Sequence, residues 1–184
     1  EERLAPVAQY NTRFPAAEQG QNWKANNAYC QSLAEDIEVV DGTFKSVVPP
    51  QNIGFDGSPT QDEETLKAAT YLLQSQRLGQ GKAVDMLGVS LSATDKIGHT
   101  YGTQGPEMCE QLMRLDAALG DFLSELDKVE GGVVLALTAD HGGADIIERT
   151  HARGFPYAHR ASFAVVEEAN AALRQQFNLD FDPL

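Results

Sequence analysis

Basic residues are scarce in this sequence: 14 Lys and Arg stand against 27 Asp and Glu, a formal net charge of −13. Surfaces that bind nucleic acids or anionic membranes need basic patches, so the charge argues against both kinds of partner. A phosphate-bearing substrate is not excluded, because a bound metal cation reverses the local sign. Long apolar runs are also lacking, and "GGVVLAL" is far too short to span a bilayer. We therefore expect no nucleic-acid-binding surface and no membrane span.

Cysteine is equally scarce, with only Cys30 and Cys109. Two cysteines so far apart in the sequence do not form a disulfide scaffold or a zinc knuckle, and the pattern leaves open whether they pair or stay free. The chain starts "EERLAPVAQY", without Met and without an apolar signal segment. We interpret this start as the interior of a longer polypeptide.

The pattern divides the chain into three parts. Residues 1–60 are rich in Asn, Gln, Gly and Pro, and we expect an irregular segment that could form a cap or an insertion, with short helical pieces around 22–38. Residues 61–150 carry the strong periodic signals and are expected to form an α/β core segment. Residues 151–184 are expected to form a loop and a helix that continue a larger domain.

The middle part predicts alternating helices and strands. Residues 58–79 and 105–129 have helical apolar spacing, and the first of these segments starts with Asp and Glu in its first turn. Residues 83–91 and 131–138 are apolar without clean alternation, which is typical of parallel strands buried on both faces. A strand, a long helix and a second strand form a crossover unit, so the two strands should be parallel in one sheet.

A carboxylate and an imidazole follow each predicted strand. Asp95 and His99 follow the first strand, and Asp140 and His141 follow the second. The carboxyl ends of parallel strands meet at one sheet edge, so both pairs should emerge there. Carboxylate oxygen and imidazole nitrogen are ligands of catalytic zinc and related divalent ions.

Either pair alone would be weak support for a metal site. An Asp four residues before a His is commonly an ordinary surface pair, and an Asp-His dipeptide can simply cap the next helix. Two pairs at one sheet edge, joined by one crossover and flanked by glycines, favour a metal site. The flanking glycines, which give the backbone freedom to turn and leave room for a ligand, are Gly98, Gly102, Gly142 and Gly143.

The stretch "SATDKIGHTYG", with "LTADHGG" further along, resembles the alkaline phosphatase superfamily. The similarity is strongest to bacterial alkaline phosphatases with a threonine nucleophile, which are relatives of the nucleotide pyrophosphatase/phosphodiesterases, and it extends from Trp23 to Gly143. It implies an α/β sandwich with a largely parallel central sheet and helices on both faces, only partly contained in this chain. It also implies a periplasmic or secreted protein.

The resemblance implies two Zn²⁺ per complete site. Asp95 and His99 would bind one zinc together with a distant His, whereas Asp140 and His141 would bind the other with an upstream Asp and the nucleophile. The implied function is hydrolysis of small phosphate monoesters through a covalent phospho-threonine. The nucleophile lies outside this chain, so we expect the chain alone to be inactive.

Three alternatives remain open at this stage. The same metal core serves nucleotide pyrophosphatases or phosphodiesterases and also sulfatases, because a fold and its metal core do not fix the substrate. A non-catalytic module is less favoured, because degenerate enzymes usually lose metal ligands first and all four are present.

His151 and His159 follow His141 too closely in the sequence to match the distant ligand. The oligomeric state is not indicated.

Overall fold

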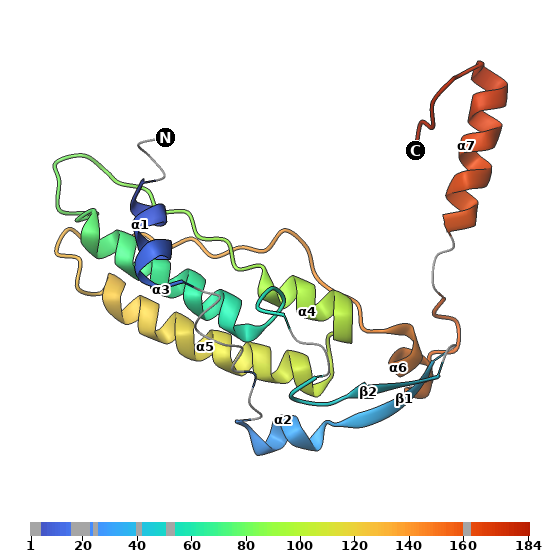
Figure 1. Cartoon of the computed structure of the whole chain (residues 1–184), viewed down its shortest axis with the longest axis horizontal. Coiled ribbons are helices and arrows are strands. Elements are labelled where there is room, and N and C mark those ends of the chain that lie inside the picture. Colours follow the sequence, from blue (N-terminus) through green and yellow to red (C-terminus); the bar gives the residue numbers. More distant parts are fainter. Residues whose placement is uncertain (1–4, 16–22, 24–25, 40–41, 51–53, 160–162) are drawn as a thin grey trace. The chain divides into compact units, whose positions relative to one another are not determined.

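The computed structural model describes residues 5–15, 23, 26–39, 42–50, 54–159 and 163–184. It divides the chain into two units, residues 1–146 and 147–184. The first unit contains, in chain order, α1 (Ala5–Arg13), α2 (Ala28–Ser32), β1 (Glu35–Val39), β2 (Gly42–Ser46), α3 (Pro59–Ser75), α4 (Ala93–Tyr101) and α5 (Pro106–Leu126). The second unit contains α6 (Ile147–Ala152) and α7 (Phe163–Phe177) (Figure 1).

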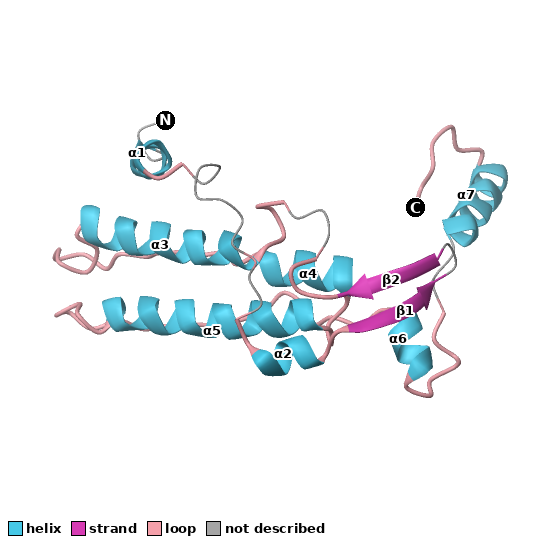
Figure 2. Ribbon diagram, turned by 60° about the horizontal axis from the view of Figure 1, so that its bottom comes forward, coloured by secondary structure: helices cyan, strands magenta, loops and turns pink. Residues whose placement is uncertain are grey.

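Helices α3 and α5 lie side by side and form the centre of the first unit (Figures 1 and 2). Both begin with a proline in the first turn, where its missing N–H costs no helical hydrogen bond. Their apolar stripes meet at Leu66, Ala69 and Phe122, which are buried together. The guanidinium of Arg114 on α5 also donates two hydrogen bonds of 2.6 Å to the Glu63 carboxylate on α3. The two predicted long helices are therefore confirmed, with slightly shorter bounds.

Helix α4 is fixed against α5 by a second buried cluster. Ala93 and Ile97 lie on one face of α4 and pack with Met108 and Trp23. The Trp23 ring meets the Tyr101 ring edge-on, with 5.8 Å between centroids. This packing determines which face of α4 remains exposed.

The region expected to be irregular contains a two-stranded antiparallel hairpin. β1 pairs with β2 in a register that runs from Glu35 opposite Ser46 to Val39 opposite Gly42. One of the short helical pieces expected within 22–38 is present as α2, but β1 occupies the end of that range. The Asp-Gly dipeptide in "VVDGT" is a known hairpin signal. Residues 40–41, between the strands, lie outside the described residues.

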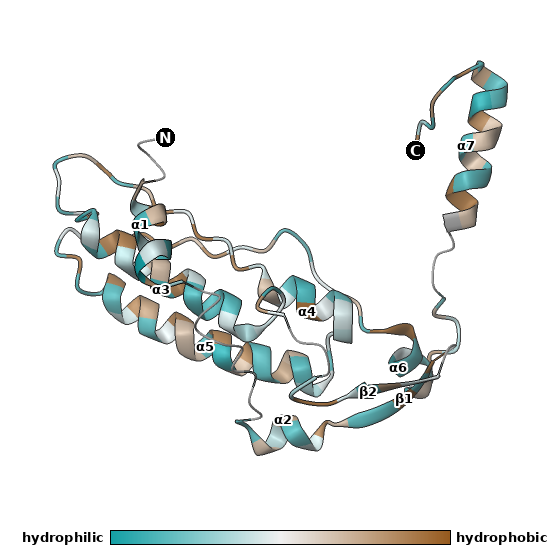
Figure 3. Ribbon diagram, in the orientation of Figure 1, coloured by the Kyte–Doolittle hydropathy of each residue, from teal (hydrophilic) through white to brown (hydrophobic). Residues whose placement is uncertain are grey.

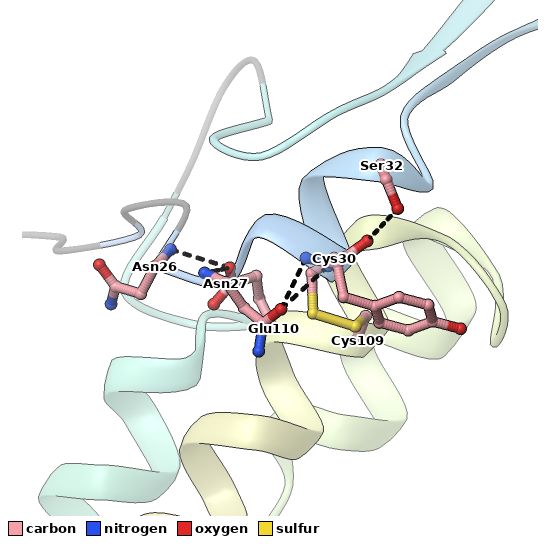
Figure 4. Close-up of a disulfide and its surroundings, with 7 residues drawn as sticks. Asn26, Asn27, Cys30, Ser32, Cys109 and Glu110 are labelled. Carbon is pink, nitrogen blue, oxygen red and sulfur yellow. Dashed lines mark hydrogen bonds between the residues drawn. A yellow bond between two sulfur atoms is a disulfide. The ribbon is translucent and has the colours of Figure 1, made fainter.

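Cys30 of α2 and Cys109 of α5 form a disulfide (Figure 4). Beside it, Glu110 Oε1 accepts hydrogen bonds from the backbone N–H groups of Asn26 and Asn27, at 2.9 and 2.8 Å. The Asn27 side chain in turn accepts from the first N–H groups of α2, the usual role of an N-cap. A covalent bond and a buried carboxylate thus attach α2 to α5.

The predicted parallel sheet is absent from the described residues. Residues 83–91 and 131–138 form no strand ladder, and both are drawn as loops (Figure 2). Leu87 and Leu91 pack on the α3–α5 cluster, whereas Val84 is 99% exposed and Val134 is 98% exposed. Both segments contain hydrophobic residues, which are brown in Figure 3. A strand needs neighbouring strands for its N–H and C=O groups, and the described residues supply none to these segments.

The second unit is a short helix followed by a longer one with a returning tail. The Asn170 amide on α7 pairs with the backbone N–H and C=O of Leu184, at 2.9 and 3.2 Å, and Arg174 pairs with Asp182. The helix expected within residues 151–184 is confirmed as α7. Among the described residues, none of the helices combines the length and apolar character needed to cross a bilayer.

Replacing both cysteines with serine should lower the free energy of unfolding by about 2–4 kcal/mol, because the disulfide restricts the unfolded chain. Denaturant titration of the full-length protein, encoded by its complete reading frame, measures this loss. The matching control is wild type with reductant, which should unfold at the same denaturant concentration as the Cys30→Ser/Cys109→Ser variant. An unchanged midpoint in both cases would contradict a stabilising disulfide.

Candidate metal centre

Helix α4 presents Asp95 and His99 on its exposed face. The two residues are one turn apart and lie away from Ala93 and Ile97, which are buried on the other face. The distance from Asp95 Oδ1 to His99 Nε2 is 3.4 Å. The burial of Ala93 and Ile97 sets the rotation of α4. The carboxylate of Asp95 and the imidazole of His99 therefore point outward.

The second pair follows residues 131–138. Asp140 Oδ1 accepts the backbone N–H of His141 at 3.0 Å, which leaves Oδ2 3.5 Å from His141 Nε2. His141 Nδ1 lies 2.8 Å from the Gly142 carbonyl. A carbonyl can only accept, so Nδ1 carries the proton, and Nε2 of the neutral ring has a free lone pair. The Gly142 carbonyl, and then the charges of Asp140 and Asp95, raise the pKa of His141 above its ordinary value.

The two pairs meet at Asp95. His141 Nε2 lies 3.7 Å from Asp95 Oδ1, so one carboxylate faces the imidazoles of both pairs. A hydrogen bond also joins the two segments that carry these pairs. The backbone N–H of Thr103, just beyond α4, donates to Asp145 Oδ1 at 3.0 Å. Our sequence analysis missed Asp145, since nothing in its spacing separates it from an ordinary surface aspartate.

The spacing within each pair fits a shared zinc ion. Two ligand atoms that each lie about 2.0–2.1 Å from a tetrahedral zinc are roughly 3.3 Å apart. The separations of 3.4 Å in the first pair and 3.5 Å in the second are close to this value. In the part of the chain that the structure describes, no group of three or more His, Cys, Asp and Glu side chains is arranged to hold a metal. Each pair would therefore need further ligands from elsewhere.

Four further residues near the pairs or among the remaining histidines have different structural roles. Gly102 ends α4 with a φ of 84°, a conformation that favours glycine. Lys96, between the two α4 residues, forms an ion pair with Asp56. His151 and His159 belong to the second unit, where their rings lie 6.3 Å apart.

Comparison with known proteins identifies the family. The model of the family "Type I phosphodiesterase / nucleotide pyrophosphatase" matches residues 9–174. The chain belongs to this family. Its membership of the alkaline phosphatase superfamily is likewise shown, as the resemblance of the two motifs implied.

Similar proteins of this superfamily are bacterial alkaline phosphatases. The chain is 42% identical over 127 residues to alkaline phosphatase PhoK from a Sphingomonas species, and 42% identical over 126 residues to PhoD from Zymomonas mobilis. Each alignment covers 68% of this chain, but only 23% of PhoK and 22% of PhoD. Alkaline phosphatase PafA from Elizabethkingia meningoseptica is 32% identical over 155 residues, which are 80% of this chain and 25% of PafA. The chain thus spans about a quarter of the length of these relatives.

The fold is also similar to a solved structure. The crystal structure of wild-type alkaline phosphatase PafA superimposes with a TM-score of 0.67 and 23% identity, covering 95% of this chain and 36% of PafA. The fold is thus like part of that enzyme. In the described residues it is mostly helical with one small antiparallel sheet.

Substitutions at two adjacent glycines, Gly142 and Gly143, test whether the segment after His141 lies against the end of α4. A Cβ added at Gly143 would lie 3.0 Å from Thr103 Cγ2, whereas one added at Gly142 would have no neighbour within 4 Å. We expect Gly143→Ala to destabilise the full-length protein by about 1 kcal/mol through overpacking, and Gly142→Ala to have little effect.

Adding Thr103→Ser removes the opposing methyl group and should restore the stability of the Gly143→Ala variant. Thermal unfolding of the four proteins measures these differences. Equal melting temperatures for the two alanine variants would show that the two motifs do not meet at Gly143 and Thr103.

Proposed function

We propose that this chain is part of a zinc-dependent phosphate monoesterase. The observation that carries the proposal is the pair of Asp–His sets, each spaced for one zinc and meeting at Asp95. The relatives reported above point in the same direction, because all of them are alkaline phosphatases.

In this proposal each pair contributes to one of two zinc sites. Asp95 and His99 hold the first zinc, and Asp140 and His141 hold the second. Two neighbouring zinc ions supply activation of a nucleophile and neutralisation of the leaving oxygen. The chain's own residues position the donor atoms: the Gly142 carbonyl fixes the His141 ring so that Nε2 faces the site, and the His141 N–H orients Asp140.

The remaining parts of the mechanism lie outside this chain. The threonine nucleophile, which would form the covalent phospho-enzyme, and the groups that contact the phosphoryl oxygens belong to other segments of the full-length protein. The further zinc ligands belong there as well. We also propose that in this protein residues 83–91 and 131–138 become parallel central strands, which would cover the exposed sides of Val84 and Val134.

Phosphodiester hydrolysis is the second candidate. The description of the matching family model, "Type I phosphodiesterase / nucleotide pyrophosphatase", favours it. A monoester and a diester differ in whether a second ester group must be accommodated at the phosphorus. The groups that would decide between a monoester and a diester are not among the four proposed metal ligands.

We further propose that the protein is exported to an oxidising compartment, either periplasmic or extracellular. The Cys30–Cys109 disulfide supports this, because such bonds persist in oxidising compartments and are rare in a reducing cytosol.

Hydrolysis of an aryl phosphate monoester and of the matching diester tests the proposed function. With zinc supplied at mildly alkaline pH, the full-length protein should hydrolyse the monoester with the higher kcat/KM. A diester preference would move the activity to the phosphodiesterase class, and turnover of neither, with zinc bound, would reject phosphate ester hydrolysis.

Zinc analysis tests the metal ligands separately from turnover. After dialysis, the full-length protein should retain two equivalents of zinc, and Asp95→Ala or His141→Ala should each retain about one or fewer. Matched controls are Asp116→Ala, on an exposed position of α5, and His159→Ala in the second unit. Retention of both equivalents by the Asp95→Ala and His141→Ala variants would exclude these residues as ligands.

A further inference from the structure

The first turn of α4 is capped by a residue of another helix. Ser92 holds the N-cap position, but its side chain makes no capping hydrogen bond. Asp62 on α3 supplies the missing acceptor, because its Oδ1 accepts the backbone N–H of Ala93 at 3.1 Å. The Asp62 side chain is 1% exposed, so water does not replace this bond.

The second oxygen of Asp62 belongs to a network that reaches the residue before Asp95. Gln111 Nε2 on α5 donates to Asp62 Oδ2 at 2.9 Å and to Thr94 Oγ1 at 3.0 Å. The two hydrogens of one amide nitrogen account for both bonds. Three helices are thereby joined at the start of α4, immediately before its first proposed zinc ligand.

The location of this network suits a role in positioning. Helix α4 has only nine residues, with Asp95 in its first turn and His99 in its last. Burial of Ala93 and Ile97 fixes the rotation of the helix, while the bonds from Asp62 and Gln111 fix where it starts. Ligands must be held within about 0.5 Å of the productive geometry, so a displaced first turn would move both residues away from a metal.

Burial also affects the protonation equilibrium of Asp62. Burial raises the pKa of Asp62, although hydrogen bonds from the Ala93 N–H and the Gln111 amide oppose the increase. A carboxyl group with a raised pKa in the folded state binds protons more tightly there than in the unfolded chain. Ionisation of Asp62 therefore costs more free energy in the folded chain than in the unfolded chain.

We propose that Asp62 is a positioning residue, which acts through the first turn of α4 to place Asp95 and His99 for metal binding. This inference rests on the proposed function, in which these two residues hold zinc. Our sequence analysis noted only that acidic residues begin α3; it did not anticipate that Asp62 would cap a different helix.

The isosteric change Asp62→Asn tests this role. An asparagine can accept from Ala93 or from Gln111, but its amide group then faces a second donor. We expect the affinity of the full-length protein for its first zinc, measured by competition with a chromogenic chelator, to fall at least tenfold. The double variant Asp62→Asn/Gln111→Glu exchanges donor and acceptor between the two side chains and should recover most of this affinity.

Glu110→Gln is the matched control. Glu110 is an equally buried carboxylate that accepts two backbone N–H groups, but it attaches α2 rather than α4. It should lose stability without a selective loss of zinc affinity. Equal zinc affinities for Asp62→Asn and wild type, equal losses in Asp62→Asn and Glu110→Gln, or no recovery in the double variant would overturn the proposal.

Amide hydrogen exchange of the zinc-free protein provides a readout that is independent of metal and turnover. Asp62→Asn should speed exchange at residues 93–95 at least tenfold, whereas Glu110→Gln should not. If wild type bound no zinc, the proposed function would fail, but faster exchange in Asp62→Asn would still show that Asp62 holds the start of α4. Unchanged exchange at these residues would overturn that role.

Discussion

Buried carboxylates on the α3–α5 pair hold the other elements of the first unit in place. Asp62 caps α4, Glu110 accepts the N–H groups before α2, and Glu107 accepts from Ser46 and from the backbone N–H that follows β2. Glu64 accepts a hydrogen bond from the Tyr10 hydroxyl of α1, and burial, together with this carboxylate, raises the pKa of Tyr10 to about 12. A carboxylate removed from water must be hydrogen-bonded. Each of these elements is therefore held at one position on the α3–α5 pair.

The parts of the fold that local sequence determines could be predicted. Helices α3 and α5 each bury an apolar stripe with helical spacing, and α7 shows helical spacing too, although its apolar side chains are largely exposed. That periodicity is visible without any knowledge of neighbours. Residue types and spacing also led to the choice of Asp95, His99, Asp140 and His141 as metal ligands, and this role stays a prediction. The structure places these residues within reach of one another.

The parts that depend on distant neighbours could not be predicted. Whether residues 83–91 form a strand depends on strands beside them, and apolar composition does not reveal whether these are present. The role of Asp62 depends on where α4 lies in space, because an acidic residue in a first turn ordinarily serves its own helix. The β1–β2 hairpin is a different case: its Asp-Gly signal was available, but the polar composition of residues 1–60 concealed it.

The bare segment "VVLAL" at 133–137 has a consequence for biosynthesis. It combines high strand propensity with no charge and no proline, which is the composition of segments that stack into intermolecular β-sheets. Its exposed valine and leucine side chains would make a newly synthesised chain a ligand for chaperones and a nucleus for aggregation. The same segment leads directly into Asp140 and His141, so covering it would protect the polypeptide and would also fix one end of the proposed metal centre.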